Sequence, residues 1–213
     1  MTATGESVAA RHSAVRQGIL LSYATIGYNS LEAIGSLVAG LLSGSVALVG
    51  FGIDSVIEVV ASIAAQWRLR VDADLSRRAE SEVLTLRIVG WCFVALAAYV
   101  TLDGVKSLYL GEEPDRSWFG LIVLTLSAIV MPALAWAKRR VAATMQSSAL
   151  EAEAKQTSLC AYLSVIALGG VGLNAFFGWW WADPVAALAM VPIIVREGVH
   201  GIRLQPHEED KCC

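Results

Sequence analysis

Apolar residues are grouped along this chain into six long blocks, separated by short polar or charged stretches. Each block has the length of a helix that crosses the hydrocarbon core of a bilayer, which takes about 20 residues. The blocks cover residues 19–42, 45–67, 83–110, 118–136, 150–177 and 182–202. The pattern predicts an all-α membrane protein with six transmembrane helices. We expect residues 18–204 to form the membrane domain, between an N-terminal tail at 1–17 and a C-terminal tail at 205–213.

The basic residues indicate how these helices are oriented. They gather before the first block, between the second and third, between the fourth and fifth, and near the end of the sixth. With six spans, all these clusters fall on one side of the membrane, which the positive-inside rule assigns to the cytoplasm. We therefore expect both termini in the cytoplasm and the protein in the plasma (inner) membrane. We also expect the run Lys138-Arg139-Arg140 to end the fourth helix.

The composition supports a membrane protein and argues against other classes. Hydrophobic residues make up 56% of the 213-residue chain and charged residues 16%, whereas soluble domains carry about a quarter charged residues. The basic residues lie in short loops, so a nucleic-acid partner is not expected. The sequence has no glycine-rich phosphate loop, nucleophile elbow or HExxH motif, so an enzyme is not expected either. The tail carries His207, Cys212 and Cys213, which suit metal binding, with a disordered tail as the alternative.

Two carboxylates lie inside the second apolar block. Asp54 and Glu58 are four residues apart, so a helix places them on one face, one turn from each other. Burying an aspartate in hydrocarbon costs roughly 2.5–3.5 kcal/mol on insertion scales, and two stacked acids also repel each other. Water, a proton, a basic partner or a cation must offset this cost. The pair therefore indicates an ion or proton site in mid-membrane.

The fifth block carries a matching set of polar residues. Glu153, Gln156 and Cys160 recur on one helical face, and the last two are one turn apart. Because the second and fifth helices run antiparallel, we expect Asp54 level with Cys160 and Glu58 nearer Gln156. Four such donors suit a tetrahedral Zn²⁺ ion, and a thiolate favours zinc, cadmium or copper over magnesium. The alternatives are a small buried Cys160, and a Gln156 that orients a ligand or bonds another helix.

Further polar residues are candidates for the ion pathway or for the support of the ligands. Glu153 lies one turn closer to the cytoplasm than Gln156, as an alternative ligand or an entrance acid. Asn29 and Glu32 lie about one turn apart in the first block. Their plainer interpretation is hydrogen-bonded packing between helices.

Several of these motifs resemble the cation diffusion facilitator (cation efflux) family. The run at 45–58 resembles its second helix, where a Gly-Ser-x-Ala-Leu start precedes an Asp-x-x-x-Asp pair. The stretch at 150–164 resembles its fifth helix, and Asp183-Pro184, followed by Arg196-Glu197-Gly198, resembles its sixth. The likeness covers nearly all of residues 17–204. We expect a minimal, membrane-only member without a cytoplasmic C-terminal domain, similar in plan to TMEM163-like zinc transporters.

The resemblance implies a homodimer that exports a divalent metal ion from the cytoplasm by alternating access, in exchange for protons. The metal ligands implied by position are Asp54, Glu58, Gln156 and Cys160. The second acid of the family motif is here Glu58, while Gln156 and Cys160 replace the usual His and Asp. These departures keep a second hypothesis open, in which the chain is a non-transporting membrane partner that binds metal or another protein.

Overall fold

The computed structural model describes residues 3–70, 75–145 and 148–203. These residues form six helices, and no strand occurs among them. The helices are α1 (Ala3–Ser43), α2 (Val46–Arg70), α3 (Leu75–Leu110), α4 (Trp118–Met145), α5 (Ser148–Phe177) and α6 (Ala182–Arg203). The predicted all-α architecture of six helices is confirmed. The potential metal-binding residues of the C-terminal tail lie outside the described residues.

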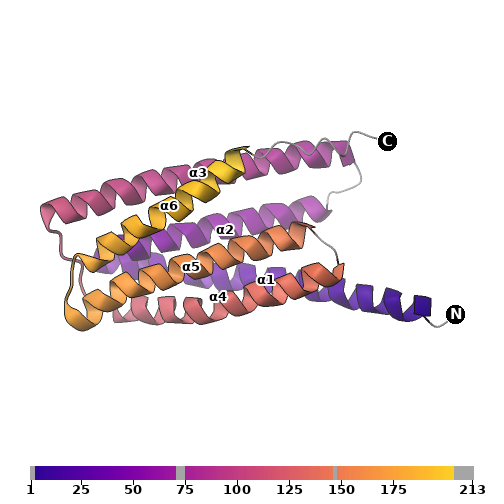
Figure 1. Ribbon diagram of the computed structural model, residues 1–213, viewed down its shortest axis with the longest axis horizontal. Coiled ribbons are helices and arrows are strands. Elements are labelled where there is room, and N and C mark those ends of the chain that lie inside the picture. Colours follow the sequence, from indigo (N-terminus) through magenta and orange to yellow (C-terminus); the bar gives the residue numbers. More distant parts are fainter. Residues whose placement is uncertain (1–2, 71–74, 146–147, 204–213) are drawn as a thin grey trace.

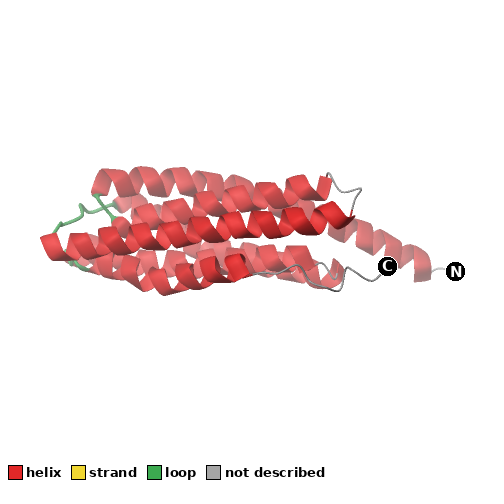
Figure 2. Cartoon of the chain, turned by 90° about the horizontal axis from the view of Figure 1, so that it is seen from above, coloured by secondary structure: helices red, strands yellow, loops and turns green. Residues whose placement is uncertain are grey.

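The helices run along one common direction, as Figures 1 and 2 show. α3 packs beside α6, and α4 packs beside α5, while α2 contacts α1, α3, α5 and α6. Among the five helices that are long and apolar enough to span a membrane, α2 has the most buried apolar window, at 67%. α2 is therefore the central helix of the bundle, and a side chain in its middle faces protein on most sides.

The remaining helix, α1, has its apolar face outward and its polar face toward the interior of the bundle. Its outward face exposes large apolar residues such as Leu31, Leu41 and Leu42. Its inward face is a buried polar stripe, which lowers the hydropathy of the helix as a whole. The stripe consists of Ser22, Thr25, Asn29, Glu32 and Ser36. Apolar residues outside and polar residues inside are the arrangement expected for a helix that faces lipid and lines a polar interior.

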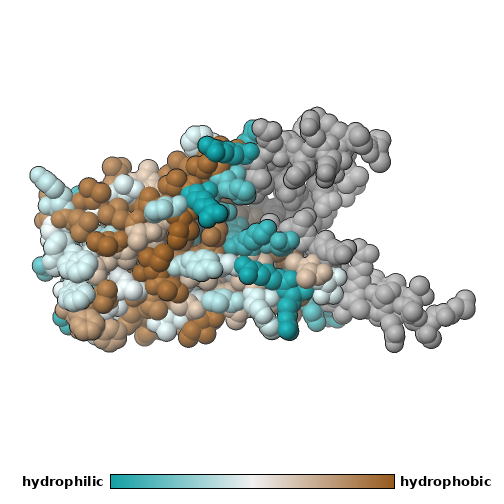
Figure 3. Space-filling model, viewed as in Figure 1, coloured by the Kyte–Doolittle hydropathy of each residue, from teal (hydrophilic) through white to brown (hydrophobic). Residues whose placement is uncertain are grey.

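The polar ends of the bundle differ from its apolar middle. In Figure 3, hydrophobic residues cover the middle of the visible face, and hydrophilic residues gather toward the end where both termini lie. At the opposite end, Trp179 and Trp181 stack with ring centroids 5.5 Å apart. Amphipathic tryptophan rings are typical of the membrane interface. Together with the five apolar spans, these features identify an integral membrane protein.

The turn between α1 and α2 is held by a residue from the other end of the chain. Gly44 adopts a positive φ of 68°, which a glycine tolerates without strain. Ser45 then caps α2, because its Oγ accepts a hydrogen bond from the amide of Leu48 at 3.1 Å. Asp183, in the first turn of α6, accepts from the Ser45 hydroxyl at 2.6 Å and from the Val46 amide at 2.9 Å. The start of α2 is thereby fixed to the start of α6.

The expected end of the fourth helix is wrong. α4 continues through Lys138-Arg139-Arg140 and ends at Met145. Lys138 is not a loop residue, because its side chain is only 1% exposed and forms an ion pair with Glu153 on α5. Arg140 instead lies over the ring of Trp136, 4.0 Å from its centroid. A buried partner on the neighbouring helix explains why a basic run does not end this one.

Prolines occur inside two helices, at Pro132 in α4 and Pro192 in α6. A proline has no amide hydrogen, so each removes one hydrogen bond from its helix. Membrane helices tolerate this loss where neighbouring helices support the backbone. Pro192 lies next to Ile193, which faces the polar site described below.

Candidate metal-binding site

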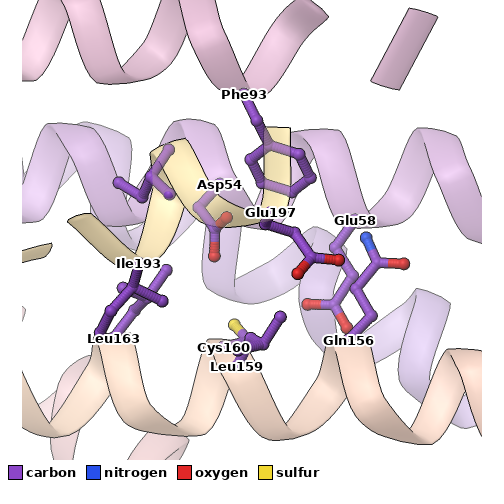
Figure 4. A pocket seen from close by; sticks show the side chains of 10 residues that line it. Asp54, Glu58, Phe93, Gln156, Leu159, Cys160, Leu163, Ile193 and Glu197 are labelled. Atoms are coloured by element: carbon purple, nitrogen blue, oxygen red, sulfur yellow. The ribbon is translucent and has the colours of Figure 1, made fainter. Parts of the chain in front are cut away.

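The middle of α2 and the middle of α5 face each other with their polar residues. Asp54 and Glu58 lie one turn apart on α2, and Gln156 and Cys160 lie one turn apart on α5. All four line a single pocket. Figure 4 shows Asp54 near Cys160 and Glu58 near Gln156, which is the register expected from antiparallel helices. The spacing of two helical pairs has therefore placed four potential donors around one space.

A third helix adds a carboxylate that the sequence interpretation did not include. Glu197 on α6 also lines the pocket. In Figure 4 its carboxylate is turned toward the same space as those of Asp54 and Glu58 and the sulfur of Cys160. Apolar side chains close the rest of the wall. They are Phe93, Leu159, Leu163, Ile193 and Ile194.

The pocket is small and largely withdrawn from solvent. Its volume is about 10 Å³, which corresponds to roughly one water-sized occupant. Asp54 is 5% exposed, Glu58 is 3% exposed and Cys160 is 2% exposed. A divalent ion stripped of most of its water fits such a space, whereas a larger organic substrate does not.

The acids of this region are only partly satisfied by hydrogen bonds. Glu58 Oε1 lies 3.3 Å from the hydroxyl of Thr157. Glu58 Oε2 is buried without a hydrogen-bond partner among the described residues. Buried polar atoms in proteins nearly always have partners, so an orphaned carboxylate oxygen at a pocket needs an explanation. A cation that binds there supplies one.

The candidates on α1 lie behind the pocket and not in its wall. Glu32 is buried, and its Oε1 accepts hydrogen bonds from the Ser55 hydroxyl at 2.8 Å and from the Cys160 thiol at 3.7 Å. Glu32 therefore contacts one of the candidate ligands directly. Asn29 is fully buried, and neither atom of its amide has a hydrogen-bond partner among the described residues.

The third polar residue of the α5 face has a different partner. Glu153 is absent from the pocket wall. Its Oε2 lies 3.4 Å from the ammonium of Lys138 and accepts a hydrogen bond from the Ser22 hydroxyl at 2.9 Å. The structure thus places Glu153 in an ion pair between α4 and α5, one turn along α5 from Gln156.

The donors surround the pocket without closing on a common point. Within residues 3–70, 75–145 and 148–203, no three His, Cys, Asp or Glu side chains stand close enough together to hold one metal ion. Zinc bonds to oxygen and sulfur ligands are about 2.0–2.3 Å long. The side chains must therefore change rotamer, or the helices that carry them must approach one another, before these groups can share an ion.

Comparison with known families agrees with this arrangement. Residues 22–203, the greater part of the chain, match the family described as the cation efflux transmembrane domain. The chain belongs to this cation efflux family. The resemblance expected from the motifs of the second, fifth and sixth helices is confirmed at the family level.

Relatives of this cation efflux protein include named antiporters and pumps. It is 25% identical over 193 residues to the cadmium, cobalt and zinc/H(+)-K(+) antiporter of Bacillus subtilis, an alignment that covers 84% of this chain and 58% of that protein. It is 28% identical over 173 residues to the uncharacterized transporter YdbO of Bacillus subtilis, covering 77% and 58%. It is 26% identical over 168 residues to the cation-efflux pump FieF of Shewanella oneidensis, covering 76% and 56%. The chain thus matches a little more than half the length of each relative.

Two charged residues near the site escaped the sequence interpretation. The basic run at 138–140 predicts a helix end, and Glu197 enters the sequence interpretation only through the motif Arg196-Glu197-Gly198. A signal for Glu197 was present, since it shares a helical face with Ile193 and Ile194, which also face the pocket. For Lys138, the signal is Glu153, an acid at a matching depth on the neighbouring helix α5.

Proposed function

We propose that this cation efflux protein carries a divalent metal ion across the membrane, out of the cytoplasm. The observation that carries the proposal is the pocket where Asp54 and Glu58 meet Gln156 and Cys160. The pocket lies in the middle of a domain whose family is defined by cation efflux. A buried pair of acids with an orphaned oxygen has little structural use in a membrane, and a divalent ion compensates both charges.

We propose zinc as the preferred ion. Asp54, Glu58 and Cys160 are the ligands, and Gln156 either completes the tetrahedron or orients a ligand. The thiol of Cys160 favours soft or borderline ions such as Zn²⁺ and Cd²⁺ over Mg²⁺ and Ca²⁺. Glu197 is a further oxygen donor at the same pocket, supplied by α6. The names of the relatives in Bacillus, which include cadmium, cobalt and zinc, support ions of this class.

Binding draws the donors together, and this closure is the conformational step of transport. The ion enters between α2 and α5, and the approach of these helices brings carboxylates and thiol to bonding distance. Carboxylic acids and thiols bind metal in their deprotonated forms. Protons that arrive from the outer side therefore displace the ion, and one site alternates between metal and protons as its exposure changes. The protein works as a homodimer in the plasma membrane, with both termini in the cytoplasm.

The decisive experiment measures zinc flux in proteoliposomes that contain the purified full chain. A zinc indicator inside the vesicles reports uptake, and Asp54→Asn is compared with the wild type. We expect the variant to lose essentially all flux and at least about 100-fold in zinc affinity, because even outer-shell partners of a metal site are worth 10–100-fold. Asp103→Asn is the matched control. It removes the same charge from a carboxylate whose partner is Tyr99 on its own helix.

Three results are informative. Flux by the wild type and the control, but not by Asp54→Asn, supports the proposal. Zinc binding without flux by the wild type favours the alternative, a non-transporting membrane partner with the same fold. Undiminished flux through Asp54→Asn excludes this site. Repeating the assay with Cd²⁺, Co²⁺, Mn²⁺ and Mg²⁺ ranks the ions, and a preference for Mg²⁺ would contradict the role given to Cys160.

A further inference from the structure

Lys138 is a buried lysine that contacts Glu153 and lies close to a second acid, Glu58. Its side chain is 1% exposed, although the two basic residues that follow it on α4 lie at the surface. Lysine is almost never fully buried unless it is paired, because its ammonium loses its hydration. The position of this cation therefore depends on the groups that face it.

Those groups connect Lys138 to the metal-binding pocket. The Lys138 ammonium lies 3.4 Å from Glu153 Oε2 and donates a hydrogen bond to the hydroxyl of Thr157 at 3.2 Å. The Thr157 hydroxyl in turn lies 3.3 Å from Glu58 Oε1 and 3.0 Å from the carbonyl oxygen of Glu153. One hydroxyl group thus separates a fixed positive charge from a candidate ligand of the metal ion.

The hydroxyl can serve only one of its two acceptors at a time. Thr157 has a single proton, which it donates either to Glu58 or to the backbone carbonyl of Glu153. In both cases the oxygen still accepts from Lys138. The pair of Glu58 and Glu153 therefore shares one ammonium, with Glu153 in direct contact and Glu58 reached through Thr157.

We propose that Lys138 is a tethered cation of the transport site, which neutralises Glu153, acts on Glu58 through Thr157, and thereby weakens divalent metal binding enough for release. This inference rests on the proposed function of the pocket. A transport site must bind its ion firmly enough to take it up and weakly enough to let it go. A site with several carboxylates and a thiol binds a divalent ion tightly, and a fixed positive charge nearby lowers that affinity, so that protons displace the ion more easily. Lys138 is that charge, and it cannot leave with the ion.

A purely structural lysine predicts a different result. If Lys138 only holds α4 against α5, its loss loosens the bundle and lowers both metal affinity and flux. If it opposes the metal ion, its loss raises affinity and slows release. The two roles therefore differ in the sign of the change in metal affinity.

The experiment titrates zinc into the purified full chain in detergent, against a competing fluorescent chelator. We compare Lys138→Met, Glu153→Gln and the double variant with the wild type. We expect Lys138→Met to bind zinc about tenfold more tightly, since one nearby charge is worth at least a tenfold change in binding. We expect Glu153→Gln to bind about tenfold more weakly, because Lys138 then turns fully toward Glu58. The double variant returns to within about threefold of the wild type, because both opposing charges are gone.

Lys155→Met is the matched control. Lys155 lies on α5, two residues from Thr157, and pairs with Glu151 at the surface, where its side chain is 69% exposed. Its loss changes the net charge of the protein by the same amount, yet we expect zinc affinity within about twofold of the wild type, as for exposed ion pairs in general. An equal effect of both lysine substitutions would show a general charge effect and overturn the proposal.

Flux measurements on the same variants complete the test. Tighter binding with slower efflux in Lys138→Met supports the tethered cation, while weaker or unchanged binding overturns it. If Lys138→Met does not fold, Glu153→Gln and the double variant decide. A weaker single variant with a restored double supports the proposal, and two equal affinities overturn it. If the wild type binds zinc but moves none, the transport function fails, yet the sign of the affinity change still tests Lys138.

Discussion

Buried carboxylates lie at two places along helix α2, and they differ in how many hydrogen bonds they accept. At its N-terminal end, both oxygens of Asp183 accept hydrogen bonds, from the Ser45 hydroxyl and from the amides of Val46 and, more weakly, Ala47. In its middle, Glu58 has an oxygen with no hydrogen-bond partner in the described part of the chain. Burial is the same, since Asp183 is 1% exposed and Glu58 is 3% exposed.

The difference teaches how to tell a structural acid from a functional one in a membrane protein. The amides at the start of a helix carry partial positive charge, and a carboxylate placed there stabilises the helix. Asp183 is therefore a cap, and its environment is complete. The carboxylates in the middle of α2 have no helix end to cap, and under the proposed function a bound cation completes the environment of Glu58. The two acids differ in whether both carboxylate oxygens have hydrogen-bond partners, and not in how deeply they are buried.

The largest effect is expected when Asp183, the acid at the start of α2, is removed. Asp183→Ala leaves the Ser45 hydroxyl and the Val46 amide without their acceptor, which costs roughly 2 kcal/mol. This loss lowers the thermal transition by about 5 °C for a chain of this size. Unfolding in detergent, followed by the fluorescence of the seven tryptophans, measures it. By contrast, Asp54→Asn is expected to leave the transition unchanged or to raise it, since it removes one of two repelling charges. Equal losses in both variants would erase the distinction.

A smaller effect is expected from the packing that holds Asp183 in place. A Cβ at Gly170 on α5 would lie 2.4 Å from the Cβ of Ala186 and 2.9 Å from the carbonyl oxygen of Ala182, both on α6. Gly170→Ala therefore pushes α6 away near its cap and costs about 1.5 kcal/mol. We expect the thermal transition to fall by about 4 °C.

The neighbouring glycine is the control for this packing effect. A Cβ at Gly169 meets nothing within 4 Å. Gly169→Ala should leave the thermal transition unchanged or raise it slightly, because alanine favours a helix more than glycine does. If the two variants have the same thermal transition, close packing of α5 on α6 does not stabilise the start of α6.

The smallest effect is expected at Glu32, which contacts the candidate ligand Cys160 from behind the pocket. Glu32→Gln keeps the shape of an acceptor for Ser55 and Cys160 but removes its charge. We expect zinc affinity to fall about tenfold, as is typical when a partner of a metal ligand is altered, with no change in thermal stability. Ser36→Ala, one turn further along α1, is the control, because its hydroxyl is buried without a hydrogen-bond partner in the described chain. Loss of affinity in both variants would assign the effect to the polar stripe as a whole.

Much of this picture follows from the order of residues. Six apolar blocks predict six helices because the bilayer imposes helical spans of about 20 residues. The four-residue spacing of Asp54 with Glu58, and of Gln156 with Cys160, predicts which helices face each other. An acid pair inside an apolar block is expensive to bury, so its position in the sequence predicts a functional site.

The residues that were missed depend on contacts between helices. Lys138 belongs to a basic run that looks like a cytoplasmic border, and only the position of Glu153 across the α4–α5 interface draws it inside. Glu197 lies near the end of its helix, where a charged residue is ordinary. Glu197 reaches the pocket because α6 lies over the space between α2 and α5, and the residue pattern of a single helix does not predict that placement.

The proline in the middle of α6 divides that helix into two parts with different contacts. The part before Pro192 is fastened to α2 through Asp183, whereas the part after it carries Glu197. Because Pro192 donates no hydrogen bond to the carbonyl of Leu188, bending is easiest at this point. Beyond Pro192, α6 packs closely on α3, since a Cβ at Gly198 would lie 3.0 Å from the carbonyl oxygen of Gly90. A bend at Pro192 would change the position of Glu197 relative to the pocket, while the N-terminal half of α6 stays attached to α2 through Asp183.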